Sequence, residues 1–594
     1  MNKHALPIAL FALGLISSAP QGAAAQAAPF PAPLSLLPQS APVVAGQSQQ
    51  FRAEFTDPAG QVTGWEVNGT VGGSAALGTV TPSGLYTAPA QAPATAVTVS
   101  AVSSSLTASA PVIVVNAPGG SVRYVAKTGK DTNPGTSALP WLTISHAAAS
   151  VRAGDTVLIH AGVYKEQVKM KISGSAQAGF VTFQNYPGET ATVDGTGLSP
   201  GGQSGLIDIE NVSFLIVKGL EIRNFKTASA AQVPIGVYVA GAGSCIEILG
   251  NHVHGIVTTV KNASGNAFGF AAYGTSGSAS LNNLIVSGNE VDHLVTGSSE
   301  SVSIDGNVQY FQVTGNYVHD DNNIAVAAIG FEGVSPVVST DQARDGLIAG
   351  NEVARISSAT NPAYTDKSAD GLYVDGGTRI VIEGNRVHQA DLGLELASEH
   401  PGRVTSDVVA RDNVIYGCNV VGISIGGYNG SVGGTDHCLI VNNTLYGNDT
   451  GQTGTGEFQI QYHATNNLFE NNAVYANAQG VFLNAFVKSS APPAVLDHNL
   501  YYAPGGGASG VQWTWQGATY TDLPTYRAKT GNDGASPFAD PQFKSLSVPD
   551  FHIAPTSPAV GAGQRLGSAV LGTFDFVGTP RVQNGTVDIG ALEH

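Results

Sequence analysis

The sequence predicts an all-β protein in which a right-handed parallel β-helix follows a small β-sandwich. Three observations predict this fold: an asparagine recurs at one-coil intervals from about residue 205 onward, 74 of 594 residues are glycine, and only 12% of residues are charged. Short turns between many strands use glycine, whereas long solvated helices need charged residues. The chain is also too long for one ordinary globular core, which favours a repeat architecture.

The repeat consists of an apolar strand, a glycine or polar residue, an asparagine, any residue and an aliphatic residue. Its register runs through Leu220, Asn251, Asn289, Asn316, Asn351, Asn385, Asn413, Asn443, Asn472 and Asn499, at separations of 31, 38, 27, 35, 34, 28, 30, 29 and 27 residues. The aliphatic residue two positions later is expected to point into the core. Asparagine suits a left-handed corner between two strands, where its side chain can also bond the asparagine of the next coil. The period therefore predicts a solenoid of about ten to twelve coils.

The N-terminus has the pattern of a secretory signal peptide. An apolar run at residues 5–16 follows a short charged start, and three alanines at 23–25 precede the expected cleavage site. We predict a signal peptide at 1–25 and a proline- and alanine-rich linker at 26–42. The protein is therefore expected to be secreted, extracellular or periplasmic. No later segment has the roughly 18 consecutive apolar residues of a membrane span.

Residues 43–117 are predicted to form the β-sandwich, because short alternating segments are separated by turns that carry glycine and proline. The segments GWEVNG at 64–69 and LGTVTPSGLYTAP at 77–89 resemble the immunoglobulin-like modules of bacterial surface and secreted proteins. The resemblance implies that Trp65 is the aromatic residue of the core and that the module is a spacer.

Residues 120–594 are predicted to form the β-helix. Its first part contains YVAKTGKD at 124–131, NPGT at 133–136 and PWLTI at 140–144, followed by an alanine-rich helical run to Val151. This order resembles the entry segment of the pectate-lyase-like superfamily of secreted β-helix proteins, which includes β-helical glycoside hydrolases. The resemblance implies that the helix caps the open end, where apolar core and unpaired strand edges would otherwise be exposed.

Charge and cysteine content limit the possible partners. A net charge of −17 and a pI of about 5.1 repel phosphate backbones, and no stripe of Lys and Arg offsets them, so nucleic acid is excluded. An extracellular polysaccharide is the expected partner and a monomer the expected state. Cys245, Cys418 and Cys438 are too few for a disulfide scaffold and are expected to be small buried hydrophobic residues.

A second strand of each coil shows strict alternation at 301–305, 371–375, 393–397, 422–426 and 457–461. Its apolar positions are expected to point inward and its other positions outward. The outward positions and their continuations contain no Lys or Arg and comprise Asp305, Tyr373, Asp375, Glu395, Glu399, Tyr428, Glu457, Gln459, Gln461 and His463. Such an acidic face suggests function.

We predict Asp375, Glu395 and Asp305 as catalytic residues. Glycosidic bond hydrolysis uses two carboxyl groups about 5–5.5 Å apart for retention or roughly 6.5–9.5 Å apart for inversion. The Cβ atoms of Asp375 and Glu395 should lie about 7–8 Å apart, and Asp305 should lie about 9.6 Å from Asp375. A long loop at 333–369 is expected to wall this cleft. The predicted substrate-binding residues are Tyr373, Glu332, Glu399, His400, Tyr428, Arg344 and Gln461.

Three functions remain open at this point. The carboxylates suit a glycoside hydrolase. They also suit a pectate-lyase-like polysaccharide lyase, in which Ca²⁺ would neutralise a uronate while Arg344, Lys367 or His400 removed a proton. The third alternative is a non-catalytic glycan-binding or adhesive protein. No residue is predicted as a metal ligand, and Ca²⁺ is expected only for the lyase.

Overall fold

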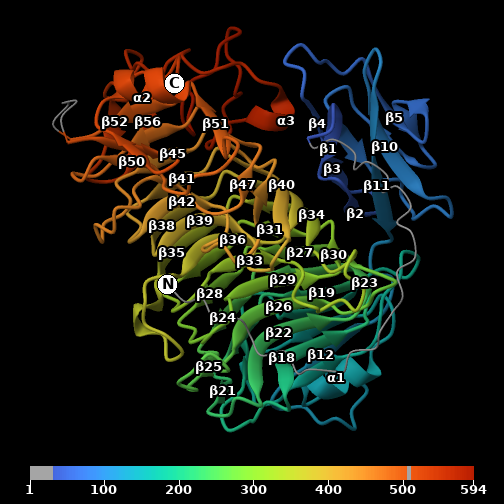
Figure 1. Ribbon diagram of the computed structural model, residues 1–594. Helices are drawn as coiled ribbons and strands as arrows, with labels where there is room; N and C mark the ends of the chain where they lie inside the picture. The colour runs from blue at the N-terminus through green and yellow to red at the C-terminus, as the bar shows by residue number, and fades with distance from the viewer. Residues whose placement is uncertain (1–30, 505–509) are drawn as a thin grey trace, which may run out of the picture.

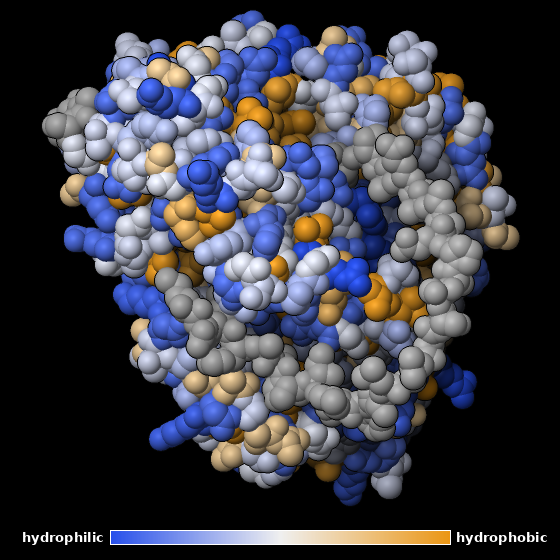
Figure 2. Space-filling view, viewed as in Figure 1, coloured by the Kyte–Doolittle hydropathy of each residue, from blue (hydrophilic) through white to orange (hydrophobic). Residues whose placement is uncertain are grey.

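The computed structural model describes residues 31–504 and 510–594 and confirms the predicted fold class (Figure 1). The predicted signal peptide, residues 1–25, lies outside the described residues. A β-sandwich comes first in the chain and a parallel β-helix follows it. The surface in the same view is mostly hydrophilic, with small separate apolar patches (Figure 2).

The sandwich is built from short strands around a small core of its own. Trp65 lies in this core together with Phe51 and Tyr86. The first strand begins at Leu34 because it pairs with residues 52–55, so the sandwich starts inside the range 26–42 that was predicted as a linker. The strands are β1 (Leu34–Leu37), β2 (Ala41–Val44), β3 (Ser48–Gln50), β4 (Arg52–Phe55), β5 (Gly64–Val67), β6 (Thr70–Val71), β7 (Gly73–Ser74), β8 (Gly78–Val80), β9 (Leu85–Thr87), β10 (Val97–Val102) and β11 (Thr107–Val115).

The β-helix has three long sheets, which we call sheets I, II and III, with 16, 12 and 13 strands. Sheet I contains β12 (Val122–Val125), β13 (Thr156–Ile159), β16 (Val181–Asn185), β19 (Leu215–Lys218), β23 (Gly243–Leu249), β27 (Leu281–Ser287), β30 (Val308–Gln309), β31 (Gln312–Thr314), β34 (Arg344–Ala349), β37 (Thr378–Glu383), β40 (Val404–Arg411), β43 (Gly434–Asp436), β44 (Leu439–Val441), β47 (Ala464–Thr465), β48 (Asn467–Glu470) and β51 (Ala494–Asp497). Sheet II contains β14 (Gly162–Tyr164), β17 (Ala191–Asp194), β20 (Glu221–Arg223), β24 (His252–His254), β28 (Glu290–Asp292), β32 (Tyr317–His319), β35 (Glu352–Ile356), β38 (Arg386–Ala390), β41 (Val414–Tyr416), β45 (Thr444–Tyr446), β49 (Ala473–Tyr475) and β52 (Leu500–Tyr502).

Sheet III carries the predicted site. It contains β15 (Val168–Met170), β18 (Gln203–Glu210), β22 (Val233–Ala240), β26 (Phe268–Gly274), β29 (Val302–Gly306), β33 (Val326–Ile329), β36 (Asp370–Asp375), β39 (Leu392–Ala397), β42 (Val421–Ile425), β46 (Phe458–Ile460), β50 (Val481–Ala485), β53 (Gln512–Trp515) and β54 (Ala518–Tyr520). The smaller pairs are β21 (Lys226–Thr227) with β25 (Val257–Thr258), and β55 (Phe543–Ser545) with β56 (Asp550–Ile553).

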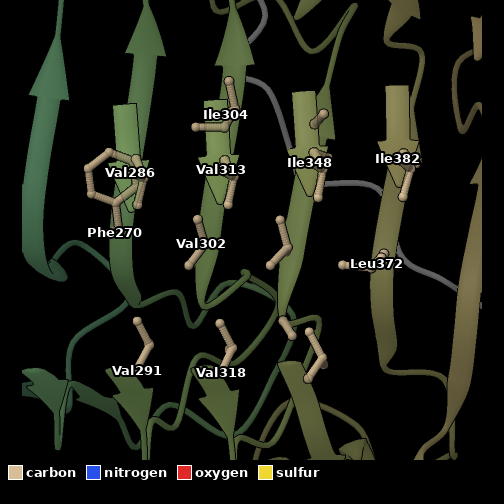
Figure 3. Packing of buried hydrophobic residues seen from close by; sticks show 14 of the residues in the cluster. Phe270, Val286, Val291, Val302, Ile304, Val313, Val318, Ile348, Leu372 and Ile382 are labelled. Carbon is tan, nitrogen blue, oxygen red and sulfur yellow. The ribbon is translucent and has the colours of Figure 1, made fainter. Parts of the chain in front are cut away.

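The core of the β-helix is a set of stacked apolar columns. Figure 3 shows Val291 beside Val318, and Val286 beside Val313, on successive coils. One column of sheet III runs from Val302 through Val326, Leu372, Leu394, Ile423 and Phe458, all fully or almost fully buried. The predicted inward positions are therefore confirmed.

The register asparagines form a continuous buried ladder from Asn251 to Asn499. Each side-chain Nδ2 donates to the Oδ1 of the next asparagine at 2.9–3.2 Å, as predicted. The prediction that these asparagines occupy the left-handed corner is wrong. Positive φ falls one residue earlier, at Gly250 (58°) and Gly288 (65°) for example, so the chain turns before the asparagine and its side chain points inward.

Helices α1 and α2 lie at the two ends of the solenoid (Figure 1). Helix α1 (Ile144–Ser150) packs Ile144 and Ala147 against the first coils, with Thr143 as its N-cap. Helix α2 (Leu523–Thr530) packs Leu523 and Tyr526 against the last coils. The remaining helical segments are α3 (Ser568–Leu571) and the 3₁₀ turn Ser358–Thr360. Both ends of the described core are thereby covered.

The sandwich lies beside the coils of sheet I, next to β40 and α3 (Figure 1). Arg411 is fully buried there, and its guanidinium donates to Glu54 of the sandwich at 2.8 Å and to Glu383 of the β-helix at 2.7 Å. Burial alone would lower the pKa of Arg411, but attraction to the Glu54 and Glu383 carboxylates outweighs it and raises the pKa above its usual value. The two domains are therefore joined by a buried ion-pair network.

The cysteine prediction is confirmed for all three residues: Cys245, Cys418 and Cys438 are buried and unbridged. Burial raises the pKa of the Cys245 thiol to about 12, which keeps it protonated. None of the helices in the described part of the chain is sufficiently long and apolar to cross a membrane.

Candidate functional site

Sheet III aligns the predicted residues as the alternation indicated. Tyr373 on β36 lies opposite Glu395 on β39, and Glu395 lies opposite Ser424 on β42. Asp305 on β29 lies opposite Ile329 on β33, which shares its column with Asp375. Asp305 and Asp375 are therefore two coils apart in one column of the outer face.

This outer face is covered rather than open. Asp305, Asp375 and Glu395 are only 1%, 3% and 1% exposed. Two segments, 331–341 and 398–403, lie over the face: Phe331 packs against Gly376 at the end of β36, and the second segment continues directly from β39. The outer face at these positions is therefore shielded from solvent. The acids lie in a partly dehydrated environment.

The prediction of a long loop at 333–369 is wrong. The range contains strands β34 and β35, and its Asn351 belongs to the asparagine ladder, so this segment forms a regular coil like its neighbours. Arg344 consequently belongs to β34 of sheet I, where its guanidinium donates to Asn307 and Gln309 at 2.9 and 3.2 Å. It does not wall the acidic cleft.

Segment 331–341 is a compact turn held by Asp341. Its carboxylate accepts the backbone N–H groups of Gly333 and Ser335, both at 2.7 Å, and Asp341 is 2% exposed. The segment thereby holds Glu332 over sheet III. A carboxylate that folds a turn has no periodic signal in the sequence, so the role of Asp341 could not be predicted from the repeat.

Glu332, Asp375 and His400 converge over the end of β36. Their ligand atoms, a carboxylate oxygen of each acid and a ring nitrogen of His400, all lie within 4.8 Å of one another. Asp375 accepts the backbone N–H of Glu399 at 2.8 Å, and its other oxygen lies 3.8 Å from His400 Nε2. Tyr373 donates its hydroxyl to Glu399 at 3.2 Å. Four of the predicted site residues therefore meet around Asp375.

Further acids crowd this centre. The pKa of Glu332 is raised to about 7, mainly by burial and secondly by the charge of Glu399. The same two kinds of cause, burial first and the charge of Glu332 second, act on two further acids. They raise the pKa of Glu300 to about 8 and the pKa of Asp305 well above its usual range. Neither carboxylate oxygen of Asp305 has a hydrogen-bond partner among the described residues. We call Glu300, Asp305, Glu332, Asp375 and Glu399 the carboxylate cluster.

The other predicted residues lie at its edge. Glu395 accepts from Gln461 Nε2 at 3.1 Å, and Gln461 also reaches Ser424 at 2.6 Å. Tyr428 follows β42 and is half-buried. Burial lowers the pKa of His400, so its imidazole is neutral at pH 7. Glu300 was missed because it precedes the aligned strand 301–305 at a position that strict alternation assigns to the interior.

A pocket of about 390 Å³ opens beside His400. Arg403 lies over the Phe331 ring, with its guanidinium carbon 5.0 Å from the ring centroid. The lining residues are Phe331, Gly333, Ser335, Pro336, Val338, Asp341, His400, Pro401 and Arg403. Segments 331–341 and 400–403 therefore form a concave site next to the carboxylate cluster.

Two family models match the β-helix. Residues 123–292 match the Pel9A-like right handed beta helix region, and residues 337–516 match a right handed beta helix region. The uncharacterized protein YwoF of Bacillus subtilis (strain 168) is 37% identical over 443 residues, which are 74% of this chain and 92% of YwoF. The chain belongs to the right-handed β-helix superfamily, in the same family as YwoF.

Several solved members of the superfamily are similar at low identity. Pectate lyase Pel9A is 15% identical over 80% of this chain and 96% of its own, with a TM-score of 0.42. XylC in complex with xylose is 12% identical over 79% and 98%, with a TM-score of 0.44. The GH136 lacto-N-biosidase from Eubacterium ramulus is 13% identical over 65% and 64%, with a TM-score of 0.42. Similarities this distant transfer no activity to this chain.

Proposed function

We propose that this β-helix protein is a secreted enzyme that hydrolyses glycosidic bonds of an extracellular polysaccharide. The observation that carries the proposal is the close approach of the Glu332 and Asp375 carboxylates, within 4.8 Å, beside a pocket of about 390 Å³. Retaining glycosidases hold their two carboxyl groups about 5–5.5 Å apart. The pair therefore supports hydrolysis with retention of anomeric configuration.

The two acids suit different roles. Burial and neighbouring charge keep Glu332 protonated up to a pKa of about 7, as a general acid requires. Asp375 is oriented by the backbone N–H of Glu399, which suits a nucleophile that must keep one position. In the first step Glu332 gives its proton to the glycosidic oxygen, an Asp375 oxygen bonds to the anomeric carbon, and the bond from that carbon to the glycosidic oxygen breaks, so the leaving sugar departs as an alcohol. In the second step Glu332 takes a proton from water, and the water oxygen displaces Asp375.

The lyase alternative has one observation in its favour, the group Glu332, Asp375 and His400, which could hold a metal ion. Calcium takes about six to eight oxygen ligands. This group includes an imidazole nitrogen, a ligand that suits transition metals instead. The group therefore does not fit the Ca²⁺ on which the lyase alternative depends. The residues present therefore support hydrolysis better than calcium-dependent elimination.

The test is a panel of soluble polysaccharides assayed in parallel for new reducing ends and for the near-ultraviolet absorbance of unsaturated uronides. Reducing ends without that absorbance, unaffected by chelator, are expected. Glu332→Gln and Asp375→Asn should abolish the signal, while Glu290→Gln, a change at an exposed acid on sheet II, should not. Unsaturated products would favour the lyase, and binding without cleavage would favour a non-catalytic glycan-binding protein.

A further inference from the structure

The outer face of sheet II carries a group of histidines that the proposed hydrolysis does not use. On six successive strands, β20, β24, β28, β32, β35 and β38, an aliphatic residue packs into the core and the residues on either side of it point outward. Five of the 14 histidines of the chain lie at these outward positions or directly after a strand. The charged and titratable residues of the face, including one from the preceding strand β17, are Asp194, Glu221, Arg223, His252, His254, Glu290, Asp292, His293, Tyr317, His319, Asp320, Glu352, Arg355, Arg386 and His388.

Four imidazoles on this face are bonded to a carboxylate of an adjacent coil. We call them the inter-coil histidine pairs: His252 Nε2 donates to Asp292 at 2.7 Å, His254 Nε2 to Glu221 at 3.0 Å, His319 Nε2 to Glu290 at 3.3 Å, and His388 Nε2 to Glu352 at 3.5 Å. Between β32 and β35 the link is an arginine, because Arg355 Nε donates to Asp320 at 2.7 Å. The face therefore links all six coils, one to the next, by contacts between a basic and an acidic side chain.

His319 lies between two carboxylates. Its Nδ1 lies 2.6 Å from Asp320 and its Nε2 lies 3.3 Å from Glu290. Ionised carboxylates only accept hydrogen bonds, and a neutral imidazole has a single N–H. In the neutral ring, Nδ1 can accept from Arg355 at 3.4 Å, but this leaves the shorter contact to Asp320 without a proton. Only the protonated ring can donate to both acids.

Asp292 is a carboxylate with two imidazole partners. Its Oδ1 accepts from His252 and its Oδ2 from His293. Burial would raise the pKa of Asp292, but the bonds from His293 and His252 outweigh it and hold the pKa below its usual value. The bond to Asp292 in turn raises the pKa of His293. Burial lowers the pKa of His388, so that pair stays neutral and is the exception.

The coils joined in this way are those that carry the carboxylate cluster. Strands β28, β32, β35 and β38 continue along the chain into β29, β33, β36 and β39 of sheet III. The acids of the cluster lie on these four strands of sheet III or in the segments beside them. A change in the bonding on sheet II therefore acts on the coils that hold the proposed site.

We propose that the inter-coil histidine pairs form a pH-responsive device that binds neighbouring coils together more strongly in mildly acidic medium than above neutral pH. Protonation turns the bond between imidazole and carboxylate into a charge-assisted hydrogen bond, which is roughly twice as strong. A histidine that binds its proton more tightly in the folded state stabilises the fold below about pH 6.5 and loses this effect as pH rises. A carboxylate with a lowered pKa stabilises the fold above about pH 4. The device is therefore strongest between these values, whatever reaction the site catalyses.

The test is a double-mutant cycle of His252→Gln, Asp292→Asn and the double variant in the full chain. Amide hydrogen exchange of peptides from β24 and β28 is measured at about pH 5.5 and about pH 8, and is expressed as protection relative to the unstructured peptide. The coupling between the two residues, expressed as a ratio of protection factors, should be about threefold or more larger at the lower pH. Equal coupling at both pH values, or larger coupling at the higher one, would overturn the proposal.

The matched control is the pair of Arg223 and Asp194, which joins β20 to β17 at 3.0 Å in the same sheet. A guanidinium keeps its charge over this pH range. Although burial opposes the charge of Asp194, hydrogen bonds lower its pKa to about 2. The cycle of Arg223→Gln and Asp194→Asn should therefore give the same coupling at both pH values, and a change as large as that of the histidine pair would also overturn the proposal. If a variant of the first cycle does not fold, His319→Gln and Glu290→Gln replace it, with the same two outcomes deciding.

Discussion

Replacing Glu332 by glutamine tests whether the carboxylate cluster is strained by crowding. The pKa of Glu332 is raised from 4.5 to about 7, mainly by burial and next by the charge of Glu399. Each pKa unit corresponds to 1.36 kcal/mol, so ionised Glu332 costs roughly 3 kcal/mol of folding stability. This value is an upper limit because the side chain is partly exposed. Glutamine keeps the shape and removes the charge.

The sign of the pH effect follows from linkage. The folded state binds the Glu332 proton more tightly than the unfolded state, so stability falls as pH rises from about 4.5 to 7. Below this window the penalty is absent, and above it the penalty is complete. Glu332→Gln should therefore raise the melting temperature by up to about 3 °C at pH 8 and leave it nearly unchanged at pH 4.5, since a chain of this size unfolds with an entropy of about 1 kcal/mol/K.

The assay is thermal unfolding at the two pH values, with Glu290→Gln as control. Glu290 is half exposed on sheet II and should show no such pH-dependent gain. Glu332→Gln should also lose at least a thousandfold in turnover on leaving groups that need protonation. A fall in melting temperature of equal size at both pH values would refute the reasoning, because Glu332 would then be a stabilising structural acid.

Three further variants test other parts of the structure. Asp375→Asn should reduce turnover a hundredfold or more with a nearly unchanged melting temperature; full activity, or unfolding, would contradict its assignment. Asn413→Ala removes two donated hydrogen bonds, at 2.9 and 3.0 Å, and interrupts the ladder, so denaturant unfolding should show a loss of about 3 kcal/mol or more. Arg411→Met leaves Glu54 buried without its guanidinium partner and leaves Glu383 with Arg52 alone, so it should cost about 3–5 kcal/mol, with faster proteolytic release of the sandwich. Unchanged proteolysis would indicate that the network does not join the domains.

The periodic features of the fold were predictable because each coil repeats the same physical requirements. An inward aliphatic residue, a ladder asparagine and an alternating strand recur with every coil, so their spacing reveals the solenoid, pairs Tyr373 with Glu395 and places Asp305 in the column of Asp375. The left-handed corner was misplaced by one residue. Asparagine is common in that conformation, but at Gly250 and Gly288 a residue without a side chain takes it and leaves the asparagine free to bond inward.

The geometry of the site was only partly predictable, because the segments that leave the repeat have no period. Alternation placed Asp375 on the outer face correctly, yet it said nothing of the turn at 331–341 that brings Glu332 to within 4.8 Å of it. The same segment supplies Phe331, which orients Arg403. Conversely, Arg344 was assigned to a loop although its segment follows the repeat. A strand's period thus indicates which residues face outward, while the contacts of the irregular segments decide which of them become a site.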